Sequence, residues 1–372
     1  MRIIFAGGGT AGHINPALAV AQHIRMTDPS AEILYVGAKG GMEEKLVAKA
    51  GFDFMGIKIS GFSRKFNLEG IKKNIVTLKR VITSSMESKK IIKDFKPDIC
   101  MGTGGYVSGP VLRTAAKMGI PIVIHEQNAF PGVTTKMLSK HAKRVMLAIP
   151  GTEKFFNENC SFSITGNPVR KDILTENKTD ARKKLGLDER PVVLSFGGSL
   201  GARKINEPIA DLIMWSCKDD RYQHIHAYGG QGKWFPEMLE KNGLNIREHK
   251  NLDIREYIDN MPTCLAAADI VICRAGAITI SELEAQGKPA ILIPSPNVAE
   301  NHQYHNAMAL VNAKAANIIE EKDLTSQALI NMVDKMLSDK TYLEKCSKNA
   351  RKMAIIDSNE RIYSIIKECA RK

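Results

Sequence analysis

One local pattern occurs twice in this chain and constrains its fold more than any other feature. An apolar strand pattern at Ile3–Ala6 runs into a glycine loop at 7–12, and a second at Val192–Phe196 runs into a glycine loop at 197–201. Each loop carries a hydroxyl residue after paired glycines, and helical spacing follows. A strand, a glycine turn and a helix in this order open a Rossmann-like unit, in which the turn and the helix N-terminus face a charged group such as a phosphate. The sequence therefore predicts two such units.

Short apolar runs alternate with longer helical patterns along the rest of the chain. This alternation predicts an α/β fold with parallel sheets that helices cover on both faces. Because the residue before a proline disfavours helix, we expect the connector between the units near Gly166-Asn167-Pro168. The predicted strands are Ile3–Ala6, Ile33–Val36, Ile99–Met101, Ile122–His125, Arg144–Leu147, Ser163–Thr165, Val192–Phe196, His224–Ala227, Ile270–Cys273 and Ala290–Ile293.

The cysteines and the apolar runs exclude several classes of protein. The seven cysteines are isolated, and none forms a Cys-x-x-Cys pair, so neither a disulfide framework nor a zinc knuckle is indicated. Such cysteine usage is typical of a reducing compartment. No run approaches the roughly 18 apolar residues that a membrane span needs, and the N-terminus is typical of a strand rather than a signal peptide.

The positive charge is concentrated in the first half of the chain. The formal net charge is +13, and residues 1–160 hold 23 of the 53 basic and 12 of the 40 acidic residues, a net charge of +11. A basic half implies an acidic partner, which is nucleic acid, an anionic membrane or a phosphorylated substrate. Nucleic acid is disfavoured because aromatic residues make up only 6% of the chain and no recognition motif is present.

The first glycine loop contains G-x-G-x-x-G, the fingerprint of dinucleotide binding. That fingerprint requires an acidic residue near the end of the second strand to hold a ribose. Here the second strand ends at Tyr35–Lys39 without an acid, so a nicotinamide oxidoreductase is disfavoured. His13 is the last residue of the loop and lies at the start of a predicted helix. Imidazole has an ordinary pKa of about 6.5, which suits a general base. The alternative is a purely structural histidine.

Four polar residues, His125-Glu126-Gln127-Asn128, follow a strand of the first half. We expect them to face a crevice, because burying them without partners would cost free energy. Glu126 is the second candidate for the general base.

The second half offers groups that suit a nucleotide diphosphate. Ser199 and its glycine loop can donate to phosphate oxygens, and Arg170 can add charge-assisted hydrogen bonds. A helix is predicted to begin near Thr279, which puts Glu282 in its first turn, where its carboxylate could hold a ribose diol or simply favour the helix N-terminus. The pairs His224/His226 and His302/His305 lack the Glu or Cys spacing of a zinc site, so we expect no metal and no cofactor.

Seven motifs occur in the order in which they occur in one family: GGGTAGHINPALAV, GTGGYVSGP, HEQNAFPG, TGNPVR, GGSLGAR, ADIVICRAGAITISE and NHQYHNA. On these motifs the chain resembles the MurG family, the N-acetylglucosaminyltransferases of glycosyltransferase family 28, from residue 1 to about residue 310. The resemblance implies a GT-B fold, with two Rossmann-like parallel-sheet domains that face each other across a cleft. It implies an acceptor and membrane-binding domain at 1–166, a UDP-GlcNAc-binding domain at 167–349, and a C-terminal helix at about 350–372 that packs back on the first domain.

The resemblance also implies an activity, which is inverting transfer of GlcNAc from UDP-GlcNAc to the C4 hydroxyl of lipid I, undecaprenyl-pyrophosphoryl-MurNAc-pentapeptide. The product would be lipid II of peptidoglycan synthesis, made by a peripheral protein at the cytoplasmic face of the bacterial plasma membrane. A UDP-GlcNAc epimerase of related fold is the alternative. The catalytic candidates are His13 and Glu126. The implied substrate-binding residues are Thr10, Ala11, Gly12, Asn128, Arg170, Ser199, Ile258, Ala277, Ile278, Thr279, Ile280, Ser281, Glu282 and Gln303, and Ala11 departs from the family, which often has Gly there.

Residues 58–96 are the candidate surface for an anionic membrane. They include 11 basic and three acidic residues, with apolar residues between them. Ile71, Ile75, Leu78 and Ile82 fall at helical spacing, which is also typical of the core face of a helix that covers a sheet.

Overall fold

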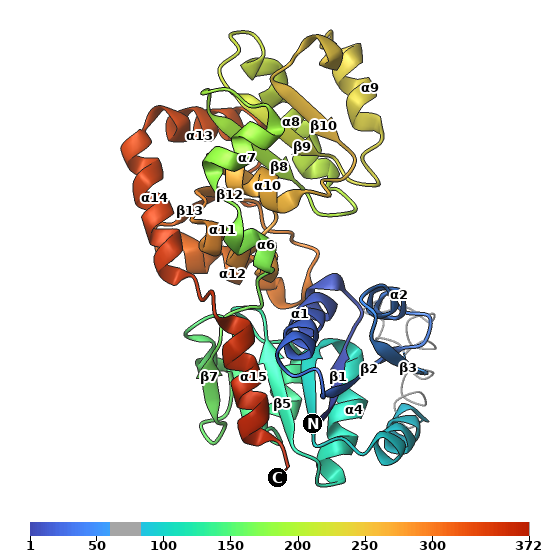
Figure 1. The fold of residues 1–372 in the computed structure, drawn as a ribbon. Helices are drawn as coiled ribbons and strands as arrows, with labels where there is room; N and C mark the ends of the chain where they lie inside the picture. The colour runs from blue at the N-terminus through green and yellow to red at the C-terminus, as the bar shows by residue number, and fades with distance from the viewer. Residues whose placement is uncertain (60–82, 372) are drawn as a thin grey trace. The chain divides into compact units, whose positions relative to one another are not determined.

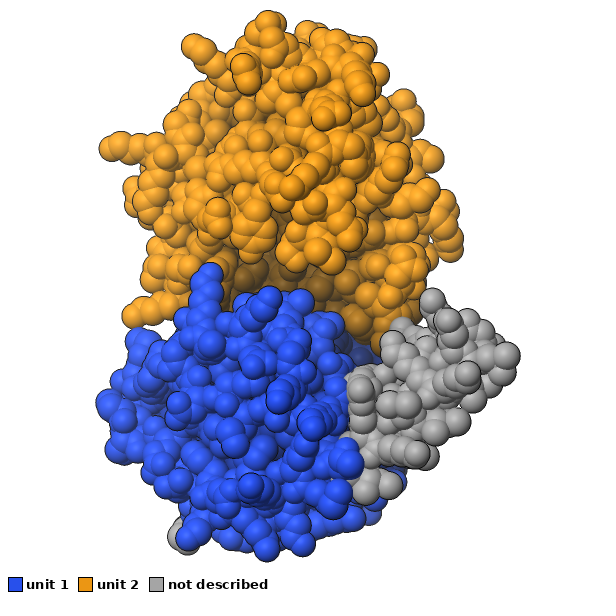
Figure 2. Space-filling model, turned by 90° about the vertical axis from the view of Figure 1, so that its right-hand side faces the viewer, with its two compact units in different colours: residues 1–168, 357–372 blue, residues 169–356 orange. Residues whose placement is uncertain are grey.

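The computed structural model describes residues 1–59 and 83–371, and these fall into two compact units (Figure 2). Unit 1 comprises Met1–Pro168 and Asp357–Lys372, and unit 2 comprises Val169–Ile356. Each unit is a parallel β-sheet covered by helices (Figure 1). The predicted α/β class with two Rossmann-like units is therefore confirmed. Within the described residues, no helix combines the length and apolarity that crossing a membrane requires.

The described part of unit 1 contains a parallel sheet in the order β3-β2-β1-β4-β5-β6-β7. Side chains alternate between the faces of β1, so that Ile3 and Phe5 pack beneath α1 and α15 while Ile4 and Ala6 pack beneath α4. The strands are β1 (Arg2–Gly7), β2 (Glu32–Ala38), β3 (Asp53–Ile57), β4 (Ile99–Gly104), β5 (Ile122–Glu126), β6 (Arg144–Leu147) and β7 (Phe162–Ile164). The helices are α1 (Ala11–Thr27), α2 (Met42–Lys49), α4 (Gly105–Lys117), α5 (Val133–Ser139), η1 (Thr152–Phe155) and α15 (Ser358–Cys369), and residues 83–95 are helical as well.

Unit 2 has a parallel sheet in the order β10-β9-β8-β11-β12-β13, again with apolar side chains on both faces of its central strands. The strands are β8 (Val192–Phe196), β9 (Gln223–Ala227), β10 (Leu252–Arg255), β11 (Ile270–Cys273), β12 (Ala290–Leu292) and β13 (Ala316–Ile318). The helices are α6 (Lys171–Thr175), α7 (Lys178–Leu185), α8 (Arg203–Ser216), α9 (Trp234–Lys241), η2 (Ile246–Glu248), α10 (Met261–Ala267), α11 (Ala277–Gln286), η3 (Ala299–Asn301), α12 (His302–Asn312), α13 (Ser326–Ser338) and α14 (Lys340–Met353).

The end of the chain crosses from one unit to the other. The helix that the sequence suggested at about 350–372 is in fact two helices, because α14 ends at Met353 and α15 begins at Ser358. α15 packs against α1 through Ile362 and Ile366, and the Tyr363 hydroxyl donates to Asp28 Oδ2 at 3.2 Å. The last helix therefore completes the core of unit 1.

Three strands, β3, β10 and β13, had no counterpart in the sequence prediction. All three lie at sheet edges. An edge strand is covered less completely than a central one, so its sequence needs no continuous apolar run.

Unit 2 buries a polar cluster between β8 and β9. The Ser195 hydroxyl lies 2.7 Å from His224 Nε2 and 2.8 Å from His226 Nδ1, and all three side chains are fully buried. The other ring nitrogens, His224 Nδ1 and His226 Nε2, have no hydrogen-bond partner among the described residues. Burial lowers the pKa of His226 to about 3 and that of His224 well below its ordinary value.

These histidines should make the fold sensitive to acid. A histidine whose folded pKa is lowered contributes stability above its unfolded pKa of about 6.5 and loses it as the pH falls toward the folded value. Between pH 6.5 and 5.5 we expect the free energy of unfolding to fall by roughly 1 kcal/mol for each of the two imidazoles. Urea unfolding across this range would measure it. The combined change Ser195→Ala, His224→Phe and His226→Phe should flatten the pH dependence, whereas His141→Phe, at an exposed site, should not.

Candidate active site

A buried carboxylate holds the first glycine loop in place through hydrogen bonds. Glu43 of α2 is fully buried, and its carboxylate accepts from the Gly9 amide at 3.3 Å and the Ala38 amide at 2.8 Å. Gly105 at the start of α4 has a φ of +78°, and a Cβ there would lie 2.1 Å from the Gly8 carbonyl oxygen. The charged group that the Gly9 amide faces is therefore the protein's own Glu43. Only glycine at 105 permits the close approach of α4 to the loop.

The three residues that follow in the loop are accessible. Thr10 is the N-cap of α1 without a side-chain capping bond, and Ala11 and Gly12 form the first helical turn. All three are exposed. They are therefore accessible to a ligand. Because residues 11 and 12 have no bulky side chain, a ligand can approach the N-terminus of the helix.

His13 is held by one ring nitrogen. Its Nδ1 lies 3.1 Å from the Thr103 carbonyl oxygen and 3.3 Å from Gln127 Oε1. The Thr103 hydroxyl donates to the His13 carbonyl at 2.7 Å. The ring is only partly buried. It is fixed in orientation and can reach a substrate through its other nitrogen.

The polar residues at the end of β5 and just after it differ from their prediction. His125, Glu126 and Gln127 are buried rather than facing a crevice, and only Asn128 is partly exposed. Burial is tolerated here because every one of the three makes hydrogen bonds. The partners lie between residues 125 and 132 and at Gly166, and the sequence does not reveal these contacts.

Glu126 stabilises its own loop. Its Oε1 accepts from the backbone amide and the side-chain amide of Asn128, each at 3.1 Å, and its Oε2 accepts from the Gly132 amide at 3.1 Å. Both carboxylate oxygens are therefore already engaged by donors of the loop, and a substrate hydroxyl would have to displace one of them. Of the two candidate bases, the geometry favours His13.

In unit 2 a second loop, residues 228–232, supports the glycine loop after β8. The amides of Gly230 and Gln231 donate to the carbonyls of Ser199 and Leu200 at 3.1 and 2.9 Å. Gly201 and Gly229 both have positive φ, and a Cβ on Gly201 would lie 2.1 Å from the Tyr228 carbonyl oxygen. This supporting loop was not predicted, although the glycine-rich run YGGQG directly follows a predicted strand. Ser199 itself is exposed.

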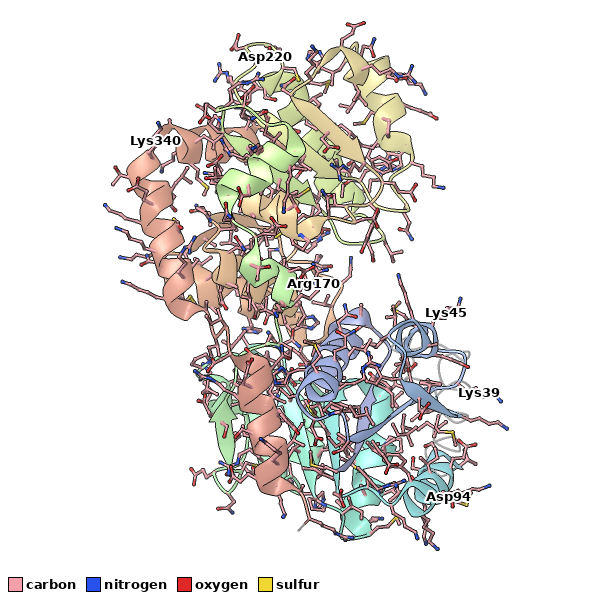
Figure 3. All side chains as sticks on the ribbon, viewed as in Figure 1. Lys39, Lys45, Asp94, Arg170, Asp220 and Lys340 are labelled. Carbon is pink, nitrogen blue, oxygen red and sulfur yellow. The ribbon has the colours of Figure 1, made fainter. Side chains whose placement is uncertain are left out.

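Arg170 and Glu282 lie close together. Arg170 is the N-cap of α6 (Figure 3), and its Nε lies 3.7 Å from Glu282 Oε1 and 3.8 Å from Asp172 Oδ1. The side chain of Arg170 is 50% exposed and that of Glu282 14%. Burial raises the pKa of Glu282 to about 7, and Arg170 opposes that shift. The pair thus presents a cation to solvent beside a carboxyl group that titrates near neutrality.

Helix α11 begins at Ala277, two residues before the predicted start, so Glu282 lies in its second turn rather than its first. Its N-cap is Gly276, which provides no side-chain cap. Ala277, Ile278 and Thr279 are partly exposed there. The side chains of Ile280 and Ile258 are buried in the core of unit 2 and Ser281 is buried as well, so a contact from Ile280 or Ile258 to a ligand would use the backbone.

Gln303 and Asn306 of α12 organise the neighbouring loops. Gln303 Oε1 accepts from the Ser295 amide at 2.9 Å, and Asn306 Nδ2 donates to the Ala275 carbonyl at 3.2 Å. Unit 2 therefore brings Arg170, Glu282 and the α11 N-terminus together. No group of three His, Cys, Asp or Glu side chains suited to a metal ion occurs within residues 1–59 and 83–371.

Comparison with known families decides the class of protein. The Glycosyltransferase family 28 N-terminal domain matches residues 3–147, and the Glycosyltransferase family 28 C-terminal domain matches residues 192–367. The chain belongs to glycosyltransferase family 28. As a family 28 glycosyltransferase it is an enzyme, and the family expected from its motifs is confirmed.

Two full-length relatives of this family 28 chain share a name. Proteins from Acetivibrio thermocellus and Ruminiclostridium cellulolyticum are 45% and 41% identical over 369 residues, 99% of this chain and 98% and 100% of theirs. Each is named UDP-N-acetylglucosamine–N-acetylmuramyl-(pentapeptide) pyrophosphoryl-undecaprenol N-acetylglucosamine transferase. The crystal structure of Acinetobacter baumannii MurG is similar, with a TM-score of 0.78, 27% identity and 99% coverage of both chains. This likeness confirms the expected GT-B fold.

Proposed function

We propose that this family 28 enzyme transfers GlcNAc from UDP-GlcNAc to the C4 hydroxyl of the MurNAc residue of lipid I, which yields lipid II for peptidoglycan synthesis. The observation that carries the proposal is the 45% identity over 99% of the chain to a protein named for this transfer. The exposed turn at Thr10–Gly12 and the Arg170–Glu282 pair support it, because each unit then offers a site for one substrate.

The chemistry is a single displacement with inversion. His13 Nε2 accepts the proton of the acceptor hydroxyl as the oxygen attacks the anomeric carbon of the donor, and the bond from that carbon to the UDP oxygen breaks. The electron pair leaves with the diphosphate, so UDP departs as an anion and the proton remains on His13. No covalent intermediate with the enzyme is required.

Unit 2 would bind the donor. The carboxylate of Glu282 accepts hydrogen bonds from the ribose hydroxyls. Residues Ala277 to Ser281 at the start of α11 contact the uracil, with Ile280 and Ile258 contributing through their backbone. Ser199 and Arg170 meet the diphosphate, where a half-exposed guanidinium can neutralise the charge that develops on leaving UDP. Gln303 reaches toward the GlcNAc.

An acceptor-dependence assay tests the function. The purified enzyme is incubated with UDP-GlcNAc labelled in the sugar, with and without a lipid I analogue, and the products are separated. We expect label in the lipid fraction and free UDP only when the acceptor is present. An epimerase would convert the sugar nucleotide without any acceptor, and that outcome would refute the proposed transfer.

We also propose that the enzyme binds an anionic membrane surface as a peripheral protein on the cytoplasmic face, where a polyprenyl-linked acceptor is found. The apolar stripe from Ile71 to Ile82 lies in residues 60–82, outside the described residues. Next to it, residues 83–95 are helical and carry the exposed Lys89, Lys90 and Lys93. Nearby Lys96 is exposed as well. These charges support electrostatic attraction to anionic lipid.

Neutralising two of these lysines should weaken membrane binding. Each lysine near an anionic surface contributes about 1 kcal/mol, so Lys89→Gln with Lys93→Gln should lower vesicle affinity roughly 30-fold. The measurement is co-sedimentation with vesicles containing anionic phospholipid, and binding by the parent should weaken steeply with added salt. Lys345→Gln with Lys348→Gln, two exposed lysines of α14 in unit 2, is the matched control. Equal loss in both variants, or equal binding to neutral vesicles, would place the membrane face elsewhere.

A further inference from the structure

A continuous chain of hydrogen bonds runs from His13 into the core of unit 1. His13 Nδ1 contacts Gln127 Oε1 at 3.3 Å, Gln127 Nε2 contacts His125 Nδ1 at 3.0 Å, and His125 Nε2 contacts the Gly166 carbonyl oxygen at 2.9 Å. Gln127 and His125 are both buried. The sequence pointed to both as polar residues that follow a strand but gave neither a role in catalysis or binding.

The far end of the chain fixes the direction of every bond in it. The Gly166 carbonyl can only accept, so His125 Nε2 must carry a proton. Burial lowers the pKa of His125, which favours the neutral ring, so its Nδ1 has a lone pair. Gln127 must therefore direct its NH₂ group at His125 Nδ1, and the same group also donates to the His125 carbonyl at 3.0 Å.

The orientation of Gln127 in turn determines the tautomer of His13. With its NH₂ group directed at His125, Gln127 presents its carbonyl oxygen to His13 Nδ1. The Thr103 carbonyl, the second group at that nitrogen, is also only an acceptor. Two acceptors at Nδ1 require a proton there, so neutral His13 has its lone pair on Nε2.

We propose that Gln127 and His125 are positioning residues that hold His13 as the Nδ1–H tautomer, with Nε2 free to accept the proton of the acceptor hydroxyl. The inference rests on the proposed function in that it assigns His13 the role of general base. In addition, Nε2 is the nitrogen that accepts the proton, and the buried Gln127 and His125 determine this. A base with the wrong tautomer presents N–H to the substrate and cannot accept its proton.

The direct test is the tautomer itself, measured by long-range ¹H–¹⁵N correlation NMR of the histidine rings at a pH where His13 is neutral, with His13→Ala used to assign its signals. We expect the parent to have a protonated Nδ1 and an unprotonated Nε2. In Gln127→Leu only the Thr103 carbonyl remains as an acceptor at Nδ1. In His125→Phe the NH₂ group of Gln127 keeps only the backbone carbonyl of residue 125 as a partner. Both variants should therefore populate the Nε2–H form more than the parent does. Gln22→Leu, at an exposed glutamine of α1, should leave the tautomer unchanged. A parent protonated at Nε2, or variants with the parent's tautomer, would overturn the inference.

Kinetics give a second readout that a merely structural role would not produce. Gln127→Leu should lower kcat about 10- to 100-fold, the range for partners that orient a catalytic group, with little change in the KM for UDP-GlcNAc. Gln127→Glu retains an acceptor at Nδ1–H, so it should recover part of the loss and move the acid limb of the kcat profile to higher pH, because a carboxylate stabilises the imidazolium. An acid limb that stays at the parent's pH in Gln127→Glu would contradict the inference.

The role of His13 as the base and the role of Gln127 and His125 in setting its tautomer can be refuted independently of each other. If His13→Ala retains turnover while the parent is the Nδ1–H tautomer, the assignment of the base is wrong and the hydrogen-bond chain stands. If His13→Ala loses turnover but the parent is protonated at Nε2, the proposed function stands and the role of Gln127 and His125 falls.

Discussion

Replacing His13 by alanine should lower turnover by about 10²- to 10⁴-fold, the range that a general base contributes. The dissociation constant for UDP-GlcNAc should remain unchanged, because His13 belongs to unit 1 and the proposed donor residues Arg170 and Glu282 belong to unit 2. Steady-state turnover with a lipid I analogue and calorimetric titration with UDP-GlcNAc measure the two quantities.

Two controls separate this effect from a general perturbation of α1 or of the neighbouring loop. His23→Ala removes an imidazole from the same helix, where the ring packs edge-on against Tyr363, and should keep turnover near that of the parent. Glu126→Gln loses a carboxylate that accepts three hydrogen bonds in its loop. If His13→Ala retained turnover within about threefold while Glu126→Gln lost it, the base would be Glu126.

Replacing Glu282 by alanine should weaken UDP-GlcNAc binding by roughly 1.5–3 kcal/mol, the contribution of hydrogen bonds to a charged group, which is about 10- to 150-fold in affinity. The side chain is mostly buried, so solvent competes little for its hydrogen bonds. Calorimetry at pH 8 measures the effect. Glu284→Gln, at a second buried glutamate on α11, is the matched control and should leave the affinity unchanged. Equal affinity of the parent and Glu282→Ala would remove Glu282 from the donor site.

The raised pKa of Glu282 adds a pH dependence to donor binding. With a pKa of about 7 the group is partly protonated at neutral pH, and the ribose hydroxyls need the carboxylate as an acceptor. Affinity for UDP-GlcNAc should therefore rise from pH 6 to pH 8 in the parent and stay flat in Glu282→Gln. An acid with a raised folded pKa loses stability as pH rises from its unfolded value to its folded value, so Glu282→Gln should melt no lower than the parent at pH 8.

The two-unit architecture was predictable because central strands of parallel sheets are buried on both faces. Val192–Phe196 and Ile270–Cys273 therefore read as apolar runs, and the strands observed there have these same bounds. The edge strand β13 is short and needs no such run, and the break before α15 depends on where the chain passes from one unit to the other. Neither is a local property of the sequence.

The candidate site was predictable where a residue's neighbours in sequence determine its role. His13 closes a glycine loop, and Glu282 follows one, and both positions are visible in the sequence. Gln127 acts through contacts to residues that lie 114 positions before it and two positions before it in the chain, at His13 and His125. The carboxylate of Glu43 beneath the first loop is likewise a product of tertiary packing, since Gly9 lies 34 residues away.

In the proposed reaction, unit 2 binds the donor and unit 1 supplies the base. A crystal structure of the enzyme with UDP-GlcNAc tests it most directly. We expect the ribose hydroxyls within hydrogen-bond distance of the Glu282 carboxylate, the uracil at the first turn of α11, and the diphosphate at Ser199 and Arg170. A uridine diphosphate bound instead at the loop from Gly7 to Gly12 would contradict the account.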